Sequence, residues 1–224
     1  MSALVMPTLE ENTQLMRRLA TSSTPDILAH IYQDDVNIAI WQNGLSEQTH
    51  EQATQLIIDE GKINLEIAAG PDEVITQLVN KHSGLTDTHH LNQHIQTLVD
   101  MFCTLFELKR AGIRLSILDQ AMCPKFHVDK IPCRLVSTFS GPATQWIAHQ
   151  DVVYSKLGKA SFNVSDDVSG IYTDANQIQT MRTGDVALLK GSNWQNNEHA
   201  GLVHRSPKQS NNQKRLVITL DFID

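Results

Sequence analysis

The chain has 224 residues, of which 41% are hydrophobic and 19% are charged. This balance is typical of one large globular domain or two small ones and excludes the disordered and fibrous classes. The net charge of −7 argues against non-specific nucleic-acid binding, which needs a basic surface. No apolar run reaches the roughly 20 residues of a membrane helix. Three cysteines and the absence of a visible signal peptide argue against a disulfide framework and predict a cytoplasmic protein.

The first half of the chain is predicted to mix helices with short strands. Residues 8–20 carry apolar side chains near helical spacing, and residues 23–26 begin a second helix with Pro25 in its first turn. The alternating run 36–41 predicts a strand. Apolar residues three and four apart predict a long helix over 85–112, with Gly112 as its C-cap. The remaining predicted elements are helices over 46–59 and 71–80 and a strand over 63–67.

From residue 113 onward the chain consists of short, often alternating apolar runs separated by glycine and proline. Such a pattern is typical of a sandwich or barrel. Residues 1–112 are therefore predicted to form a helical or mixed N-terminal region, and residues 113–224 a β-rich core. One cooperative domain agrees with the sequence as well as two do. Strands are predicted over 114–118, 135–139, 145–148, 186–189 and 216–220.

Four polar residues of the second half have a spacing that suits metal chemistry. One residue separates His127 from Asp129, His204 follows His127 by 77 positions, and Arg215 follows His204 by 11. Two histidines and one carboxylate can occupy one face of an octahedral Fe(II). Alternation on a strand would place His127 and Asp129 on the same side. The planar guanidinium of Arg215 is suited to bind a carboxylate through two parallel hydrogen bonds.

These four residues and the segments 124–129, 134–144, 183–185 and 203–207 resemble the Fe(II)/2-oxoglutarate-dependent dioxygenases of the double-stranded β-helix (jelly-roll) type. More closely they resemble a bacterial family of unknown function whose members are often encoded near zinc-handling GTPases. The resemblance implies an α+β fold with a jelly-roll core and a helical N-terminal region. It implies that His127, Asp129 and His204 form the catalytic Fe(II) centre and that Arg215 anchors the co-substrate 2-oxoglutarate. An unidentified small molecule or protein would be the oxidised substrate.

Two departures and one competing motif accompany this resemblance. Val217 stands where many of these enzymes have a serine two residues after the anchoring arginine, and Pro142 stands where a second glycine is frequent. A second His-x-Asp triplet, His149 with Asp151, competes with His127 and Asp129 for the metal. We favour the first triplet because the glycine turn at 141 and an expected return strand follow it at the expected distance.

Other readings of the metal site stay open. Cys123 and Cys133 flank His127 and Asp129 and would give a closed Zn(II) site. A separate alternative for the function is a non-oxidative, cupin-like metal-binding protein linked to zinc handling. A third reading is an inactive barrel that serves as an interaction module.

Several neighbouring residues have two interpretations each. Arg134 either binds an anionic ligand or forms a salt bridge at the barrel rim. Trp194 either covers the substrate or anchors its loop. His90 and His94 lie one helical turn apart and are predicted to belong to a solvated helix start.

Overall fold

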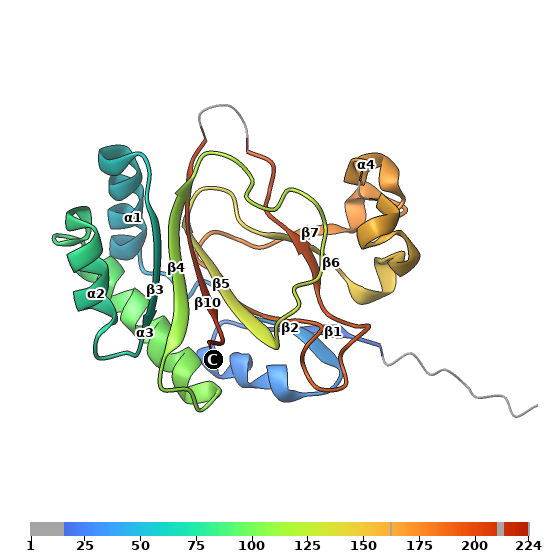
Figure 1. Ribbon diagram of the computed structural model, residues 1–224, viewed down its shortest axis with the longest axis horizontal. Coiled ribbons are helices and arrows are strands. Elements are labelled where there is room, and N and C mark those ends of the chain that lie inside the picture. The colour runs from blue at the N-terminus through green and yellow to red at the C-terminus, as the bar shows by residue number, and fades with distance from the viewer. Residues whose placement is uncertain (1–15, 162, 210–212, 224) are drawn as a thin grey trace, which may run out of the picture.

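The computed structural model describes residues 16–161, 163–209 and 213–223. Two sheets face each other, and helices cover the outer face of the larger one (Figure 1). All strand pairs are antiparallel except β1 with β2. The larger sheet has the order β1 (Arg18–Ser22), β2 (Val36–Trp41), β8 (Val186–Lys190), β5 (Cys133–Ser140), β10 (Arg215–Asp221), β4 (Ala111–Leu118) and β3 (Asn64–Ala69). The smaller sheet has the order β7 (Ile178–Thr180), β6 (Gln145–Ile147) and β9 (Val203–Arg205).

Three α-helices lie on the outer face of the larger sheet: α1 (Glu47–Glu60), α2 (Val74–Lys81) and α3 (His89–Leu105). The first is closed at both ends by its own sequence. The Ser46 hydroxyl accepts a hydrogen bond from the Thr49 amide, and Gly61 ends the helix at a φ of 67°. The short helix α4 (Asp166–Ser169) lies at the far end of the smaller sheet (Figure 1). Short 3-10 helices complete the described chain at Pro25–Tyr32, Ser83–Leu85, His149–Asp151, Tyr154–Lys156, Gly158–Ser161 and Ala175–Gln177.

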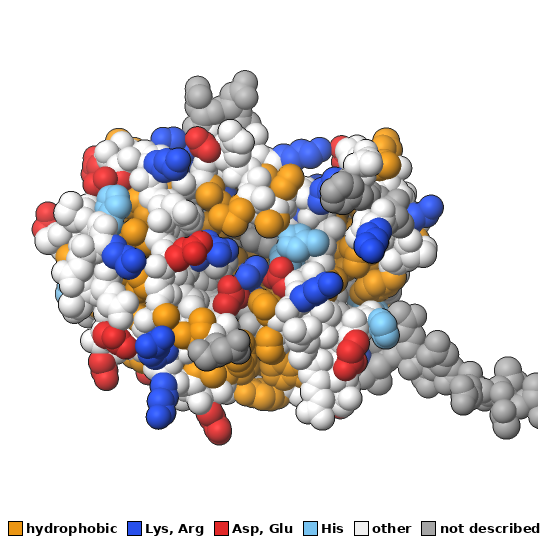
Figure 2. All heavy atoms as spheres, in the orientation of Figure 1, with side chains coloured by type: hydrophobic (Ala, Val, Ile, Leu, Met, Phe, Trp, Pro, Cys, Tyr) orange, Lys and Arg blue, Asp and Glu red, His pale blue; other side chains and the backbone are white. Residues whose placement is uncertain are grey.

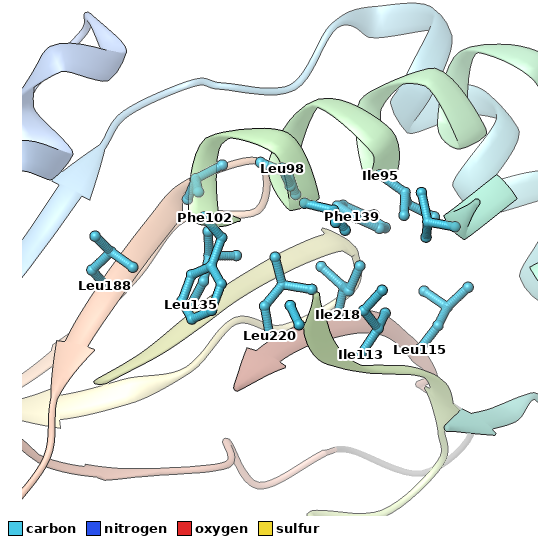
Figure 3. Close-up of a cluster of buried hydrophobic side chains, with 14 of the residues drawn as sticks. Ile95, Leu98, Phe102, Ile113, Leu115, Leu135, Phe139, Leu188, Ile218 and Leu220 are labelled. Carbon is cyan, nitrogen blue, oxygen red and sulfur yellow. The ribbon is translucent and has the colours of Figure 1, made fainter. Parts of the chain in front are cut away.

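The main core lies between the larger sheet and α3, and it follows from the two-residue period of the strands. Alternate residues of β4 and β10 point toward the helix, where they meet Ile95, Leu98 and Phe102 (Figure 3). Each such buried side chain contributes roughly 1.5–3 kcal/mol. The opposite residues of the same strands face the smaller sheet. The strand residues on the helix side are Ile113, Leu115, Ile117, Leu216, Ile218 and Leu220.

Seven strand predictions match β2, β3, β4, β5, β6, β8 and β10, one helix prediction is wrong, and another extends past the end of its helix. The predicted helix over 8–20 lies partly outside the described residues, and its described end is strand β1. The helix predicted over 85–112 is α3, which ends at Leu105, and Gly112 lies inside β4 instead of capping a helix. A Cβ at Gly112 would come within 2.7 Å of Ile223, so close packing explains this glycine.

Two further expectations about the β-rich part are corrected. The segment 145–148 is not a return strand to β5, because β6 crosses into the smaller sheet and pairs with β7 and β9. His127 and Asp129 lie in the loop between β4 and β5, outside a continuous strand, and only an isolated bridge joins His127 to His204.

The strands of the first 112 residues flank both edges of the larger sheet. β1 and β2 extend it on one side and β3 on the other. Whether residues 1–112 and 113–224 fold as separate units stays a prediction. None of the described helices combines the length and the apolar character needed to cross a membrane.

Candidate metal centre

His127, Asp129 and His204 converge although 77 positions separate the two histidines. Their ligand atoms all lie within 4.8 Å of one another. The bridge between His127 and His204 brings the loop before β5 onto β9 through two backbone hydrogen bonds of 3.0 Å. The Nε2 atoms of His127 and His204 lie 3.5 and 3.4 Å from the carboxylate oxygens of Asp129. The sequence-predicted triad is therefore assembled in space.

The outer nitrogen of each histidine is held by the backbone. Nδ1 of His127 lies 2.9 Å from the Lys125 carbonyl, and Nδ1 of His204 lies 3.1 Å from the Leu202 carbonyl. A carbonyl can only accept, so Nδ1 carries a proton in both rings, and loss of the other ring proton leaves Nε2 of each histidine as the metal-binding atom. Two imidazoles and one carboxylate form the donor set of a mononuclear Fe(II) or Zn(II) site. The residues present therefore fit a metal ion.

Asp129 is kept ionised, as a metal ligand must be. Burial opposes its charge, but hydrogen bonds from His127 and His204 and the charge of Arg134 outweigh burial, so the pKa of Asp129 is held well below 3.8. The pKa of His127 is raised above 6.5. Burial lowers it, but the hydrogen bonds to Asp129 and to the Lys125 carbonyl prevail. Protons therefore compete with a metal for this ring.

Arg134 forms two ion pairs at the rim of the site. Its Nε and Nη2 donate to both carboxylate oxygens of Asp221 at 2.7 and 2.8 Å, and its Nη1 donates to Oδ2 of Asp129 at 2.7 Å. This arrangement leaves Oδ1 of Asp129 as the oxygen without an arginine partner. Arg134 thus forms the rim salt bridge, which is one of its two interpretations. It contacts the candidate metal site through Asp129.

Arg215 lies at the start of β10, and its side chain lines the same cavity as His127 and His204. It is only 4% exposed. Its Nε has no hydrogen-bond partner, and its Nη1 makes one long bond of 3.4 Å to the Pro142 carbonyl. Burial lowers the pKa of Arg215 from 12.5 to about 10. No ion pair to Arg215 occurs within the described part of the chain, so a buried cation faces the cavity without an anion.

The cavity lies between the two sheets and opens near the centre of the face drawn in Figure 2, where acidic, basic and histidine side chains gather around a hollow. Its floor is the inward face of the larger sheet. Its opposite wall carries Thr144, His204, Arg205 and Ser206. The residues of the floor are Arg114, Ser116, Leu118, Arg134, Val136, Leu189, Arg215, Val217 and Thr219.

The competing ligand residues lie elsewhere. His149 is buried and its Nδ1 lies 2.7 Å from the Tyr154 hydroxyl, and the segment after it forms 3-10 turns in place of the possible strand. Cys133 belongs to the main core, where burial raises its thiol pKa, and Cys123 is exposed at the cavity. Among the described residues, the candidate metal group consists of the triad alone, so the two cysteines do not complete a four-ligand site.

Two other predicted features have structural roles. Trp194 packs edge-on against Tyr32 and Phe106, with ring centroids 5.4 and 6.1 Å apart, so its side chain anchors the loop and does not line the cavity of the triad. His94 is not solvated as expected. It packs against Phe139 at 5.6 Å, and burial lowers its pKa to about 4.

Sequence reasoning missed Asp221, Thr219 and Arg114, all of which contact or line the cavity. A signal was present, because residues 215, 217, 219 and 221 alternate with apolar residues along the last strand, and alternate residues of a strand share one face. The partner strands could not be read in the same way, since their register depends on pairing. Asp166, which holds Arg205 at 2.8 Å, carried no local signal.

Comparison with known proteins places the chain in a family. A family model described as "Protein of unknown function (DUF1826)" matches residues 22–221. The chain belongs to this family. No curated protein matches it. The expected membership in a family of unknown function is confirmed.

Solved structures show the fold. The dioxygenase for auxin oxidation 1 from Arabidopsis thaliana, in a complex with 2-oxoglutarate, superposes with a TM-score of 0.52 at 8% identity, over 93% of this chain and 94% of that chain. The rice dioxygenase for auxin oxidation gives a TM-score of 0.50 at 8% identity, over 92% and 83%. The fold is α+β with a double-stranded β-helix core, like the fold of these two proteins.

Proposed function

We propose that this protein is an Fe(II)- and 2-oxoglutarate-dependent oxygenase. The observation that carries the proposal is the coexistence, in one cavity, of a two-histidine, one-carboxylate group and a buried arginine without an acidic partner. A metal alone would leave Arg215 unexplained. A dicarboxylate co-substrate accounts for both, because one end can bind the metal and the other the guanidinium.

In this proposal each residue of the site has a defined task. His127, Asp129 and His204 would hold Fe(II). Arg215 orients the far carboxylate of 2-oxoglutarate. Val136, Leu189 and Val217 supply apolar wall that limits water. When bound, Fe(II) with 2-oxoglutarate and O₂ supplies the oxidising chemistry.

A second candidate function rests on the donor set itself. Two histidines and one carboxylate also bind Zn(II), and a non-oxidative metal-binding protein linked to zinc handling would use the same triad. The position of Arg215 favours the oxygenase, because zinc binding alone would not require a buried cation on the cavity floor. The cytoplasmic location and the small-molecule or protein substrate stay predictions from the sequence.

Anaerobic titration of the metal-free protein with Fe(II), followed by 2-oxoglutarate, tests the proposal. The expected result is a weak visible charge-transfer band that needs both additions, together with succinate release once O₂ is admitted. His127→Ala and His204→Ala should lose the band through loss of the metal. Arg215→Gln should keep the metal and bind 2-oxoglutarate much more weakly. Metal binding without any response to 2-oxoglutarate would support the zinc-binding function instead.

A further inference from the structure

The two ends of the cavity floor differ in their exposure and in their free hydrogen-bonding groups. Arg215 stands at one end of β10, beside the turn that follows β5, and its side chain makes one bond to the described residues, to the Pro142 carbonyl of that turn. Asp221 stands at the other end, where it pairs with Arg134 and through it with Asp129. Arg215 is 4% exposed, whereas the side chain of Arg114, at the Asp221 end, is 37% exposed. The Arg215 end is closed, and the Arg114 end reaches solvent.

Thr219 and Arg114 lie side by side at the open end. They are register partners in the β4–β10 pair, and both line the cavity. The Thr219 hydroxyl oxygen is buried and has no hydrogen-bond partner among the residues that the structure describes. Arg114 donates through Nε to Glu66 at 2.8 Å, which leaves its two terminal nitrogens without a hydrogen bond to the described residues. At the open end, the Thr219 hydroxyl and the two terminal nitrogens of Arg114 are therefore available to bind a ligand.

The remaining arginines of the cavity are already paired. Arg134 is held by Asp129 and Asp221. Arg205 donates to Asp166 at 2.8 Å and to Gln145 at 2.9 Å. Arg134 bonds through three guanidinium nitrogens and Arg205 through two, whereas Arg114 bonds to the described residues through Nε alone and keeps both terminal nitrogens for a ligand.

In the proposed function one molecule of 2-oxoglutarate uses both of its carboxylates, one on Arg215 and the other on the metal of the triad. It has no oxyanion left for Arg114 and Thr219. In addition, the Arg215 guanidinium bonds toward the Pro142 turn, away from Thr219. The open end is therefore a second subsite.

We propose that the primary substrate carries an anionic oxygen group, a carboxylate or a phosphate, and that Arg114 and Thr219 bind this group at the open end of the cavity beside Asp129. The inference rests on the proposed function, since it takes the Arg215 end to be filled by 2-oxoglutarate. An arginine stays charged at all working pH values and donates in a plane, and a threonine hydroxyl adds one further donor. An oxyanion can accept hydrogen bonds from both side chains, whereas a neutral or cationic group would leave the charge of the guanidinium unpaired.

The probe for this subsite is inorganic phosphate, titrated into the protein saturated with Zn(II) and 2-oxoglutarate and followed by NMR of the β4 and β10 amides. We expect Arg114→Gln and Thr219→Val each to weaken phosphate binding at least fivefold, with the affinity for 2-oxoglutarate unchanged within twofold. Thr219→Ser keeps the hydroxyl and should bind phosphate within twofold of the wild type. Arg110→Gln is the matched control, because it removes an equal charge from an exposed position outside the cavity.

Two outcomes overturn the inference: wild-type protein that binds no phosphate at the open end, or Arg114→Gln protein that binds it as the wild type does. The second outcome includes phosphate held by the zinc ion alone. The phosphate titration is repeated in the Arg215→Gln variant without 2-oxoglutarate, so that the subsite is tested independently of the proposed function. If the wild type fails to bind 2-oxoglutarate, the proposed function fails, while the response of phosphate binding to Arg114→Gln still decides the subsite. Equal thermal midpoints and native amide spectra exclude unfolding of a variant as the cause.

Discussion

Replacement of Arg215 by methionine should stabilise the ligand-free protein while it removes the affinity for 2-oxoglutarate. The guanidinium is 4% exposed, its Nε is unpartnered, and its one bond of 3.4 Å is long. Burial lowers its pKa from 12.5 to about 10, which at about 1.4 kcal/mol per pKa unit corresponds to a cost of about 3 kcal/mol for the charged form. Because about 10 is still far above neutral pH, the residue stays charged and this cost applies throughout the physiological range.

Methionine has a similar apolar stem and no charge, so most of this cost should disappear. After about 1 kcal/mol is subtracted for the lost bond to the Pro142 carbonyl, the expected gain in the free energy of unfolding is about 2 kcal/mol. For a chain of this size that gain raises the thermal midpoint by roughly 5 °C. The reason is that the cavity is preorganised for an anion, and a buried cation without its anion destabilises the fold.

Urea denaturation at pH 7.5, without ligand and again with saturating Zn(II) and 2-oxoglutarate, measures both effects. The ligand should stabilise the wild type and leave Arg215→Met unaffected beyond the effect of the metal. Arg110→Met, at an exposed position, should change the free energy of unfolding by less than about 0.5 kcal/mol. A loss of more than about 1 kcal/mol in Arg215→Met would refute the reasoning, because it would mean that a structural partner satisfies the guanidinium.

Three further predictions concern the surroundings of the site. Gly141→Ala should weaken 2-oxoglutarate binding by calorimetry, because Gly141 has a φ of 87° and a Cβ there would come within 2.8 Å of the Arg215 backbone; an unchanged affinity would show that the turn is not rigid. Arg134→Met should lower the free energy of unfolding of the metal-free protein by about 2–3 kcal/mol, and by less with Zn(II) bound, since the metal then neutralises Asp129; equal losses in urea would contradict this. Zn(II) affinity should fall as the pH drops through the raised pKa of His127, because protons then compete for the ring. A Zn(II) affinity that stays constant between about pH 8 and about pH 6, a range around the ordinary histidine pKa, would exclude the ring as a ligand.

Most strands were predictable because their signal is local, whereas β1, β7 and β9 were not predicted. Alternation of apolar and polar residues needs no knowledge of the partner strand, and the predicted run 36–41 coincides with β2. Helix α1 was predictable for a similar reason, since Ser46 and Gly61 mark its two ends in the sequence. The end of α3 was not predictable in this way, because apolar spacing continues past Leu105 into a strand. After Leu105 the chain leaves the helix and continues toward strand β4 of the larger sheet.

The sequence by itself determined the chemical types of the site and their order: His127, Asp129, His204 and Arg215. It could do so because a motif of ligand residues is read from identity and spacing alone. Only the tertiary structure decided that Cys133 faces the core and that Arg134 is occupied by two carboxylates. It alone decided that Thr219 and Arg114 stand side by side. Register between strands distant in sequence follows from packing of the whole sheet, and no local pattern along one strand contains it.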